Sequence, residues 1–224
     1  TGVAGTNRNF ALARGFGFDG VVTEAGTGAP VSNGRVSIYQ SVNGQALSMG
    51  SVSVNAQGAY QVGGLPEGEY FGDFQSPTHA PMTLGGRLCP WTRCATEMVE
   101  AEVPIRLSSS LLSQSYNLQT PRAGILSVSV ADDVTALPLG GTLVAVAVGG
   151  NTPTFVDANV TGVAGTAVFF GVAPGTYYVL VEGAGKIPEA YDNASCPSQR
   201  SCTAREVIAL GRAVTVSAGT NTSV

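Results

Sequence analysis

The chain of 224 residues contains one stretch of sequence twice. Residues 65–70 read LPEGEY and residues 172–177 read VAPGTY, so that Gly68 matches Gly175 at a distance of 107 residues. The dipeptide Cys-Pro at residues 89–90 recurs at 196–197 with the same offset of 107. A fixed period of this length indicates two copies of one folding unit of about 105 residues each.

The chain does not begin and end at the boundaries of this repeat. The first copy ends in a strand-like stretch at residues 116–118, whereas the second copy reaches Val224 without an equivalent, so we expect its final strand to be missing. A stretch of that kind stands at the N-terminus instead. The sequence therefore predicts a donor-type strand at residues 1–15, repeat 1 at 16–121 and repeat 2, without its final strand, at 122–224. Because the chain begins without methionine or a secretory signal, we expect it to be processed or part of a longer protein.

Composition restricts the fold and the function classes. The chain has 30 Gly and 12 Pro, only 12% charged residues and 44% hydrophobic residues. Period-two alternation, as in residues 51–54 and 127–130, predicts short strands joined by turns, and no window has a helical stripe. We therefore expect an all-β protein made of two tandem Ig-like Greek-key sandwiches with seven strands each, preceded by the N-terminal extension strand. The balance of 11 basic to 15 acidic residues, with no basic cluster, argues against nucleic acid as a partner. No apolar run reaches the roughly 20 residues of a membrane span.

The four cysteines form two local pairs, Cys89 with Cys94 and Cys196 with Cys202. A metal site is the alternative to two disulfides. The pairs stand about a hundred residues apart along the chain, and no histidine is close to either, which favours one small disulfide loop in each repeat. Disulfides indicate an oxidising compartment, and we expect an extracellular protein.

The first copy contains the turn and strand motifs GVV at residues 20–22, TGAPV at 27–31, VSI at 36–38, GAY at 58–60 and GLPEGEY at 64–70; the second copy keeps Gly165, Pro174-Gly175 and Tyr177-Tyr178. These motifs resemble the carboxypeptidase regulatory-like family, whose prealbumin-like sandwiches are related to the Cna B-type repeats of bacterial surface proteins. The resemblance implies secreted bacterial spacers, stalks and accessory modules and does not imply catalysis. Cna B-type domains often carry an intramolecular Lys–Asn isopeptide bond. Lys186 is the one lysine of this chain and lies outside an early strand, so we do not expect such bonds.

The sequence contains motifs that resemble a cofactor-binding or catalytic site, but the residues around them do not match what such a site needs. Residues 15–20 fit the pattern GxGxxG, but a strand and a Gly/Pro turn follow where the dinucleotide motif needs a helix. His79 is the single histidine, and we expect it on a surface loop between Pro77 and Pro81. We predict no catalytic residues, no metal site and no cofactor. Trp91 and Tyr191 stand near the cysteine loops and are candidates for stacking against a sugar.

The functional prediction depends on the expected missing strand of repeat 2 and on the strand-like segment at the N-terminus. A sandwich without its last strand leaves an unpaired sheet edge, which an extended segment of another molecule can fill by β-strand addition. The candidate donor residues are Asn9, Phe10, Ala11, Leu12 and Ala13, with Phe10 and Leu12 on one face of the strand. We therefore expect a non-enzymatic subunit of an extracellular or surface fibre, which polymerises head to tail with copies of itself. The alternative is a carbohydrate-binding or adhesion module, or a spacer from a longer secreted repeat protein.

Overall fold

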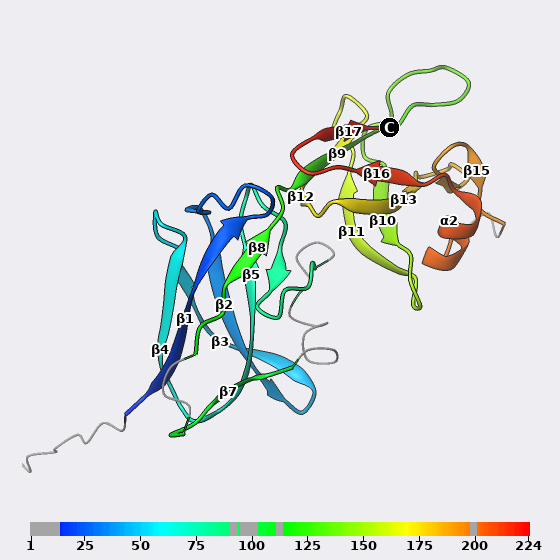
Figure 1. The fold of residues 1–224 in the computed structure, drawn as a ribbon. Helices are drawn as coiled ribbons and strands as arrows, with labels where there is room; N and C mark the ends of the chain where they lie inside the picture. The colour runs from blue at the N-terminus through cyan, green and yellow to red at the C-terminus, as the bar shows by residue number, and fades with distance from the viewer. Residues whose placement is uncertain (1–13, 90–93, 95–102, 111–113, 198–200) are drawn as a thin grey trace, which may run out of the picture.

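A computed structural model describes residues 14–89, 94, 103–110, 114–197 and 201–224. The chain forms two β-sandwiches in sequence order, one from each repeat (Figure 1). The prediction of an all-β protein with two tandem sandwiches is therefore confirmed. Of the predicted N-terminal strand, residues 1–13 lie outside the described part of the chain.

Repeat 1 consists of two sheets that enclose one core. The first sheet has the order β4-β1-β8, and β8 runs parallel to β1. The second has the order β3-β2-β5, and both β6 and β7 pair with the far side of β5. The strands are β1 (Phe16–Glu24), β2 (Arg35–Val42), β3 (Gln45–Ser53), β4 (Ala59–Leu65), β5 (Gly68–Gln75), β6 (Met82–Thr83), β7 (Ile105–Leu107) and β8 (Leu118–Thr120).

Repeat 2 has the same arrangement. Its first sheet has the order β12-β9-β17, with β17 parallel to β9, and its second has the order β11-β10-β13-β14-β15, with β16 also paired to β13. The elements are β9 (Gly124–Ser129), β10 (Leu143–Val148), β11 (Thr154–Val160), β12 (Thr166–Val172), β13 (Gly175–Glu182), β14 (Glu189–Ala190), β15 (Ala194–Ser195), α2 (Ala204–Leu210), β16 (Val214–Val216) and β17 (Asn221–Ser223).

The repeated turn motif at residues 65–70 and 172–177 anchors one tyrosine in each core. The Tyr70 hydroxyl donates to the Pro66 carbonyl (3.0 Å), and the Tyr177 hydroxyl donates to the Ala173 carbonyl (2.6 Å). Both rings are buried, at 0% and 4% exposed. Because a buried hydroxyl needs a partner, the motif supplies an apolar ring and its acceptor from one turn, which explains why it is present in both copies.

The paired cysteines pack against the second sheet in each repeat, Cys89 and Cys94 against Phe71 of β5 and Cys196 and Cys202 against Leu180 of β13. The structure joins Cys89 to Cys94 and Cys196 to Cys202 by disulfide bonds. In repeat 2 the buried Cys196 and Cys202 pack with Leu180 and with Val207 of α2. The helix α2 is not predicted by the periodicity of the sequence, which has no helical stripe. Its signal is a capping box, in which Thr203 and Glu206 bond to each other's backbone amides.

One prediction about repeat 2 needs correction. The prediction that its final strand is missing is wrong, because β17 pairs in parallel with β9 on the same edge that β8 occupies in repeat 1. The error comes from the constant offset of 107. The connection before β17 comprises residues 217–220, whereas the one before β8 comprises residues 108–117, so the closing strand of repeat 2 begins earlier than the offset predicts.

Candidate assembly site

The closing segment of repeat 1, residues 114–120, lies along the second half of β1. The Tyr116 amide donates to the Asp19 carbonyl (2.8 Å), and further along Leu118 lies opposite Val22. Leu118 is 2% exposed and Val22 is fully buried. The segment thus completes both the sheet and the core at this edge.

In repeat 2, β17 covers only the first part of the corresponding edge. The Val224 amide donates to the Ser127 carbonyl (3.0 Å), which matches the contact between Tyr116 and Asp19 at an offset of 108. The next residues of this edge, Val130 and Ala131, have no strand beside them on this side among the described residues. Val130 is half-buried and Ala131 exposed, although the matching Val22 of repeat 1 is fully buried.

A cleft of about 200 Å³ opens at this place. We call it the repeat 2 cleft. Its apolar lining consists of Val128, Val130, Ala131, Val179, Val181, Ala190, Tyr191 and Val224. Val224 stands at one end of it. The cleft lies where Leu118 and Thr120 would be if repeat 2 were superposed on repeat 1 by the pairing of their strands.

A second hollow of about 270 Å³ continues the repeat 2 cleft, with which it shares Val130, Ala131, Val181 and Glu189. Its polar lining includes Asp132, Asp133 and Lys186. The acidic side chains of this lining are Asp132, Asp133 and Glu189, and its basic side chain is Lys186, so this end of the cleft carries a net negative charge.

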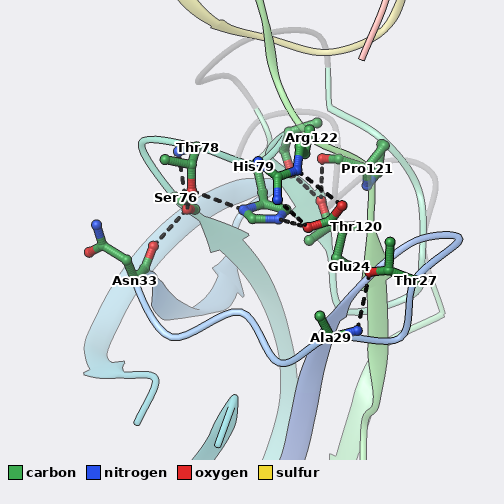
Figure 2. A network of polar contacts seen from close by, with 11 residues as sticks. Glu24, Thr27, Ala29, Asn33, Ser76, Thr78, His79, Thr120, Pro121 and Arg122 are labelled. Atoms are coloured by element: carbon green, nitrogen blue, oxygen red, sulfur yellow. Dashed lines mark hydrogen bonds and ion pairs between the residues drawn. The ribbon is translucent and has the colours of Figure 1, made fainter. Parts of the chain in front are cut away.

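At the end of repeat 1 that leads into repeat 2, Glu24, His79 and Arg122 form an ionic cluster (Figure 2). Arg122 binds the Glu24 carboxylate in a fork, from Nε to Oε1 (3.0 Å) and from Nη2 to Oε2 (3.0 Å). His79 Nε2 lies 3.6 Å from Oε2. Hydrogen bonding from Arg122, followed by its charge, lowers the pKa of Glu24. Burial lowers the pKa of His79, against the opposing effect of Glu24.

Backbone hydrogen bonds around this cluster hold the linker between the two sandwiches, residues 121–123, against repeat 1. The Ala80 amide donates to the Pro121 carbonyl (2.9 Å), and the Ala123 amide donates to the Thr78 carbonyl (3.0 Å). The Thr120 hydroxyl, which is fully buried, donates to the Ala80 carbonyl (2.7 Å). The cluster and these bonds together fix the chain at the point where it leaves the first sandwich.

Repeat 2 has an ion pair at the corresponding end. Lys186 binds the Asp132 carboxylate, whose pKa is lowered first by that hydrogen bond and then by the bond from the Thr135 amide. Asp132 stands 108 residues after Glu24, and Lys186 stands 107 residues after His79. Among the described residues no arginine takes the place of Arg122 beside this pair.

The sequence-predicted site residues have different outcomes. Tyr191 is half-buried against the core of repeat 2 and lines the repeat 2 cleft, and its contact with a sugar stays a prediction. Trp91 and the donor residues 9–13 lie outside the described part of the chain. The expectation that His79 occupies a surface loop is wrong, because His79 is 8% exposed and its Nδ1 lies 3.0 Å from the Thr78 hydroxyl. Within the described ranges no group of metal-ligating side chains occurs, and no helix is long and apolar enough to cross a membrane.

Sequence reasoning missed both ionic clusters at the ends of the sandwiches. A signal was present, because offsets of 107 and 108 residues relate a basic and an acidic position of the two copies: His79 matches Lys186 at 107, and Glu24 matches Asp132 at 108. The differences in residue type within each match hid the correspondence.

No known family model matches the chain, and no curated protein matches it. Solved structures give only distant similarity. The minor pilin GBS52 of Streptococcus agalactiae is 16% identical with a TM-score of 0.39, and the match covers 93% of each chain. A DUF3823 family protein of Bacteroides uniformis is 12% identical with a TM-score of 0.34 over 92% of this chain and 99% of that one. The TIE protein of Bacillus anthracis is 13% identical with a TM-score of 0.35; the match covers 94% of this chain and 33% of that protein.

Proposed function

We propose that the chain is a structural, non-enzymatic subunit of an extracellular or surface fibre, and that it assembles head to tail with copies of itself. In each contact the N-terminal residues 9–13 of one copy enter the repeat 2 cleft of the next. The observation that carries this proposal is the half-covered edge of β9, where Val130 is half-buried in the position of the fully buried Val22.

The donor sequence fits the register of this edge. An offset of 108, which relates β1 to β9, aligns Asn9 with Asn117, Phe10 with Leu118 and Leu12 with Thr120. Leu118 and Thr120 are the buried side chains of the closing strand, at 2% and 0% exposed. Phe10 and Leu12 therefore occupy the sequence positions whose side chains enter the core.

The energetics indicate a reversible contact. Burying one Phe and one Leu contributes about 1.5–3 kcal/mol each, while ordering five residues costs roughly 1–2 kcal/mol per residue. The backbone hydrogen bonds of a parallel strand add about 1 kcal/mol each. Since these terms nearly balance, the segment alone binds weakly, and a fibre needs further contacts around the cleft.

The two disulfide loops agree with an extracellular structural role. The heterologous contact between the start of one copy and the second sandwich of another does not close on itself, and it therefore produces filaments.

A register-specific crosslink tests the proposal. In repeat 1, Thr23 lies opposite Gln119, and the matching residues of the intermolecular pair are Ala131 and Ala11. The double variant Ala11→Cys/Ala131→Cys should give a ladder of covalent multimers on non-reducing gels, because paired residues lie within disulfide reach. The control Ala13→Cys/Ala131→Cys is displaced by two residues along the strand, about 6.6 Å, and should give no ladder.

Light scattering over a range of protein concentrations supplies the second measurement. The full chain should show multiples of its mass, and a variant without residues 1–13 should remain monomeric. Val130→Arg should also block assembly, whereas Val160→Arg, at a valine that is 53% exposed on β11, should not. A monomeric full chain at every concentration would refute the fibre. The same monomer would arise if the segment that fills the cleft belonged to a following part of a longer protein.

A second candidate function is glycan binding between the repeats. A hollow of about 510 Å³ is lined by Arg35, Gln75 and Phe170, and the Phe170 side chain is 69% exposed. An exposed aromatic ring beside polar side chains is a common arrangement for sugar stacking. Binding to a glycan array that is lost in Phe170→Ala, with assembly unchanged, would favour this function.

A further inference from the structure

The junction between the two repeats of one chain provides a pattern for the junction between two chains. Arg122 stands two residues before β9 (Gly124–Ser129), and it binds the Glu24 carboxylate at the end of the preceding sandwich. Arg14 stands two residues before β1 (Phe16–Glu24), and the offset of 108 aligns it with Arg122. Arg14 is exposed.

The carboxylate that accepts the arginine, Glu24 in repeat 1, has a counterpart in repeat 2, Asp132. The Val22 amide donates to the Gly58 carbonyl and the Val130 amide to the Gly165 carbonyl, both at 2.8 Å, so the strand ends that carry Glu24 and Asp132 are structurally equivalent. Thr23 and Ala131 form matching bridges to Pro30 and Pro138. Asp132 thus occupies the place in repeat 2 from which Glu24 binds the linker arginine in repeat 1.

The Asp132 carboxylate is oriented by its own loop. Its Oδ1 accepts bonds from the Val134 amide (3.1 Å), the Thr135 amide (2.9 Å) and the Thr135 hydroxyl (3.0 Å). These bonds leave Oδ2 directed toward Lys186, whose side chain is 43% exposed. Because a carboxylate oxygen accepts more than one bond, Oδ2 can bind a second cation without losing the first.

Charge and apolar surface favour the same partner. The segment of residues 1–15 contains Arg8 and Arg14 and no acidic residue. The end of the repeat 2 cleft carries Asp132, Asp133 and Glu189 against Lys186. The loops around it, which Figure 1 places at the same end as the C-terminus, expose apolar side chains: Val134 at 85%, Leu137 at 64% and Val163 at 98%. A positively charged segment followed by a sandwich is complementary to this surface.

We infer that Arg14 of an incoming copy binds Asp132 at the acidic end of the repeat 2 cleft, so that each contact between chains reproduces the contact of Arg122 with Glu24 inside a chain. This inference rests on the proposed strand donation and adds to it the residue pair that sets the register and orientation of the next subunit. The partner of this surface is therefore a second copy of the same chain.

A double-mutant cycle on the full chain tests the pair, with the critical concentration for assembly as the readout. Asp132→Asn keeps an oxygen for the loop amides and removes the charge, and Arg14→Gln removes the charge of the donor. Each single change should raise the critical concentration about threefold to tenfold, as expected for the net contribution of a typical hydrogen bond at a partly exposed site. The double variant should lie close to either single variant, because the two changes remove one interaction. Arg205→Gln, an exposed arginine on α2, is the matched control and should leave assembly unchanged.

The outcomes separate this inference from the proposed function. If the unmodified chain does not assemble, both fail. If it assembles and Arg14→Gln assembles equally well, or if the two changes act additively, the pairing of Arg14 with Asp132 is refuted while strand donation stands. Circular dichroism of each variant should match the unmodified chain. Thermal unfolding of Arg14→Gln should match it as well, since Arg14 is exposed. Asp132→Asn keeps an acceptor oxygen for the loop amides but loses its ion pair with Lys186, so a small fall in Tm is expected for this variant.

Discussion

Replacing Leu118 by alanine measures how much the closing strand stabilises a sandwich of this kind. Leu118 is 2% exposed and belongs to the core of repeat 1 together with Val22, which lies opposite it. A Leu→Ala change at such a site removes buried apolar surface and leaves a cavity, at a cost of about 2–5 kcal/mol in the free energy of unfolding. For a sandwich of about 105 residues, this corresponds to a fall in Tm of roughly 10–30 °C.

Differential scanning calorimetry of the full chain is the assay, because the two sandwiches have separate cores and we expect separate transitions. Leu118→Ala should lower one transition and leave the other in place. Leu47→Ala is the control: Leu47 lies on β3 in the same repeat, is 54% exposed, and should change the free energy of unfolding by less than about 0.5 kcal/mol.

A loss below about 1 kcal/mol for Leu118→Ala, well under the range for a buried leucine, would refute the reasoning behind the proposed assembly. It would mean that a side chain in the closing position contributes little even when it is covalently tethered. Filling the corresponding cleft of repeat 2 with a segment of another molecule would then contribute too little to hold a fibre together.

Three further predictions concern the stability of the individual sandwiches. Gly165→Ala should destabilise repeat 2 by more than about 1 kcal/mol in chemical denaturation, since Gly165 has a φ of +69° and an added Cβ would lie 2.5 Å from the Val130 carbonyl; an unchanged midpoint would contradict it. Replacing Cys196 and Cys202 together by alanine should cost about 2 kcal/mol in repeat 2 only, because the disulfide closes a short loop against α2. Burial raises the pKa of Asp73 to about 6, so the folded state holds this proton more tightly than the unfolded one and stability from this group falls as pH rises from about 4 to 6. Asp73→Asn should therefore be more stable than the unmodified chain at pH 7, by up to about 3 kcal/mol, and equal to it near pH 4 in pH-dependent denaturation.

The sequence predicts the sandwiches well because their determinants are local and present twice. The turn around Gly68 and Gly175 brings Tyr70 and Tyr177 back onto a carbonyl of the same turn, four residues earlier in each case. Alternating strands such as residues 127–130 point one face to the core for the same local reason.

The sequence predicts the edges and the junction poorly because their determinants are distant along the chain. The pairing of β17 with β9 depends on the length of the connection after β16, which differs between the repeats. The burial of His79 depends on Glu24, 55 residues earlier, and on the linker that passes beside it (Figure 2). A residue-by-residue offset cannot show either effect, since it assumes loops of equal length and contacts within one repeat.

Side chains at matching positions of the two repeats differ in size in a way that is consistent with the proposed contact between separate molecules. Val181 lines the repeat 2 cleft where repeat 1 has the larger Phe74, and the aligned donor residues Phe10 and Leu12 are larger than Leu118 and Thr120. In the proposed contact, the larger side chains of the donor would face Val181 of the acceptor where repeat 1 has Phe74. A closing strand within one chain is tethered at a high effective concentration and needs little burial to stay in place. A donor from another molecule must also offset the loss of translational freedom, and larger apolar side chains in a wider cleft provide that additional burial.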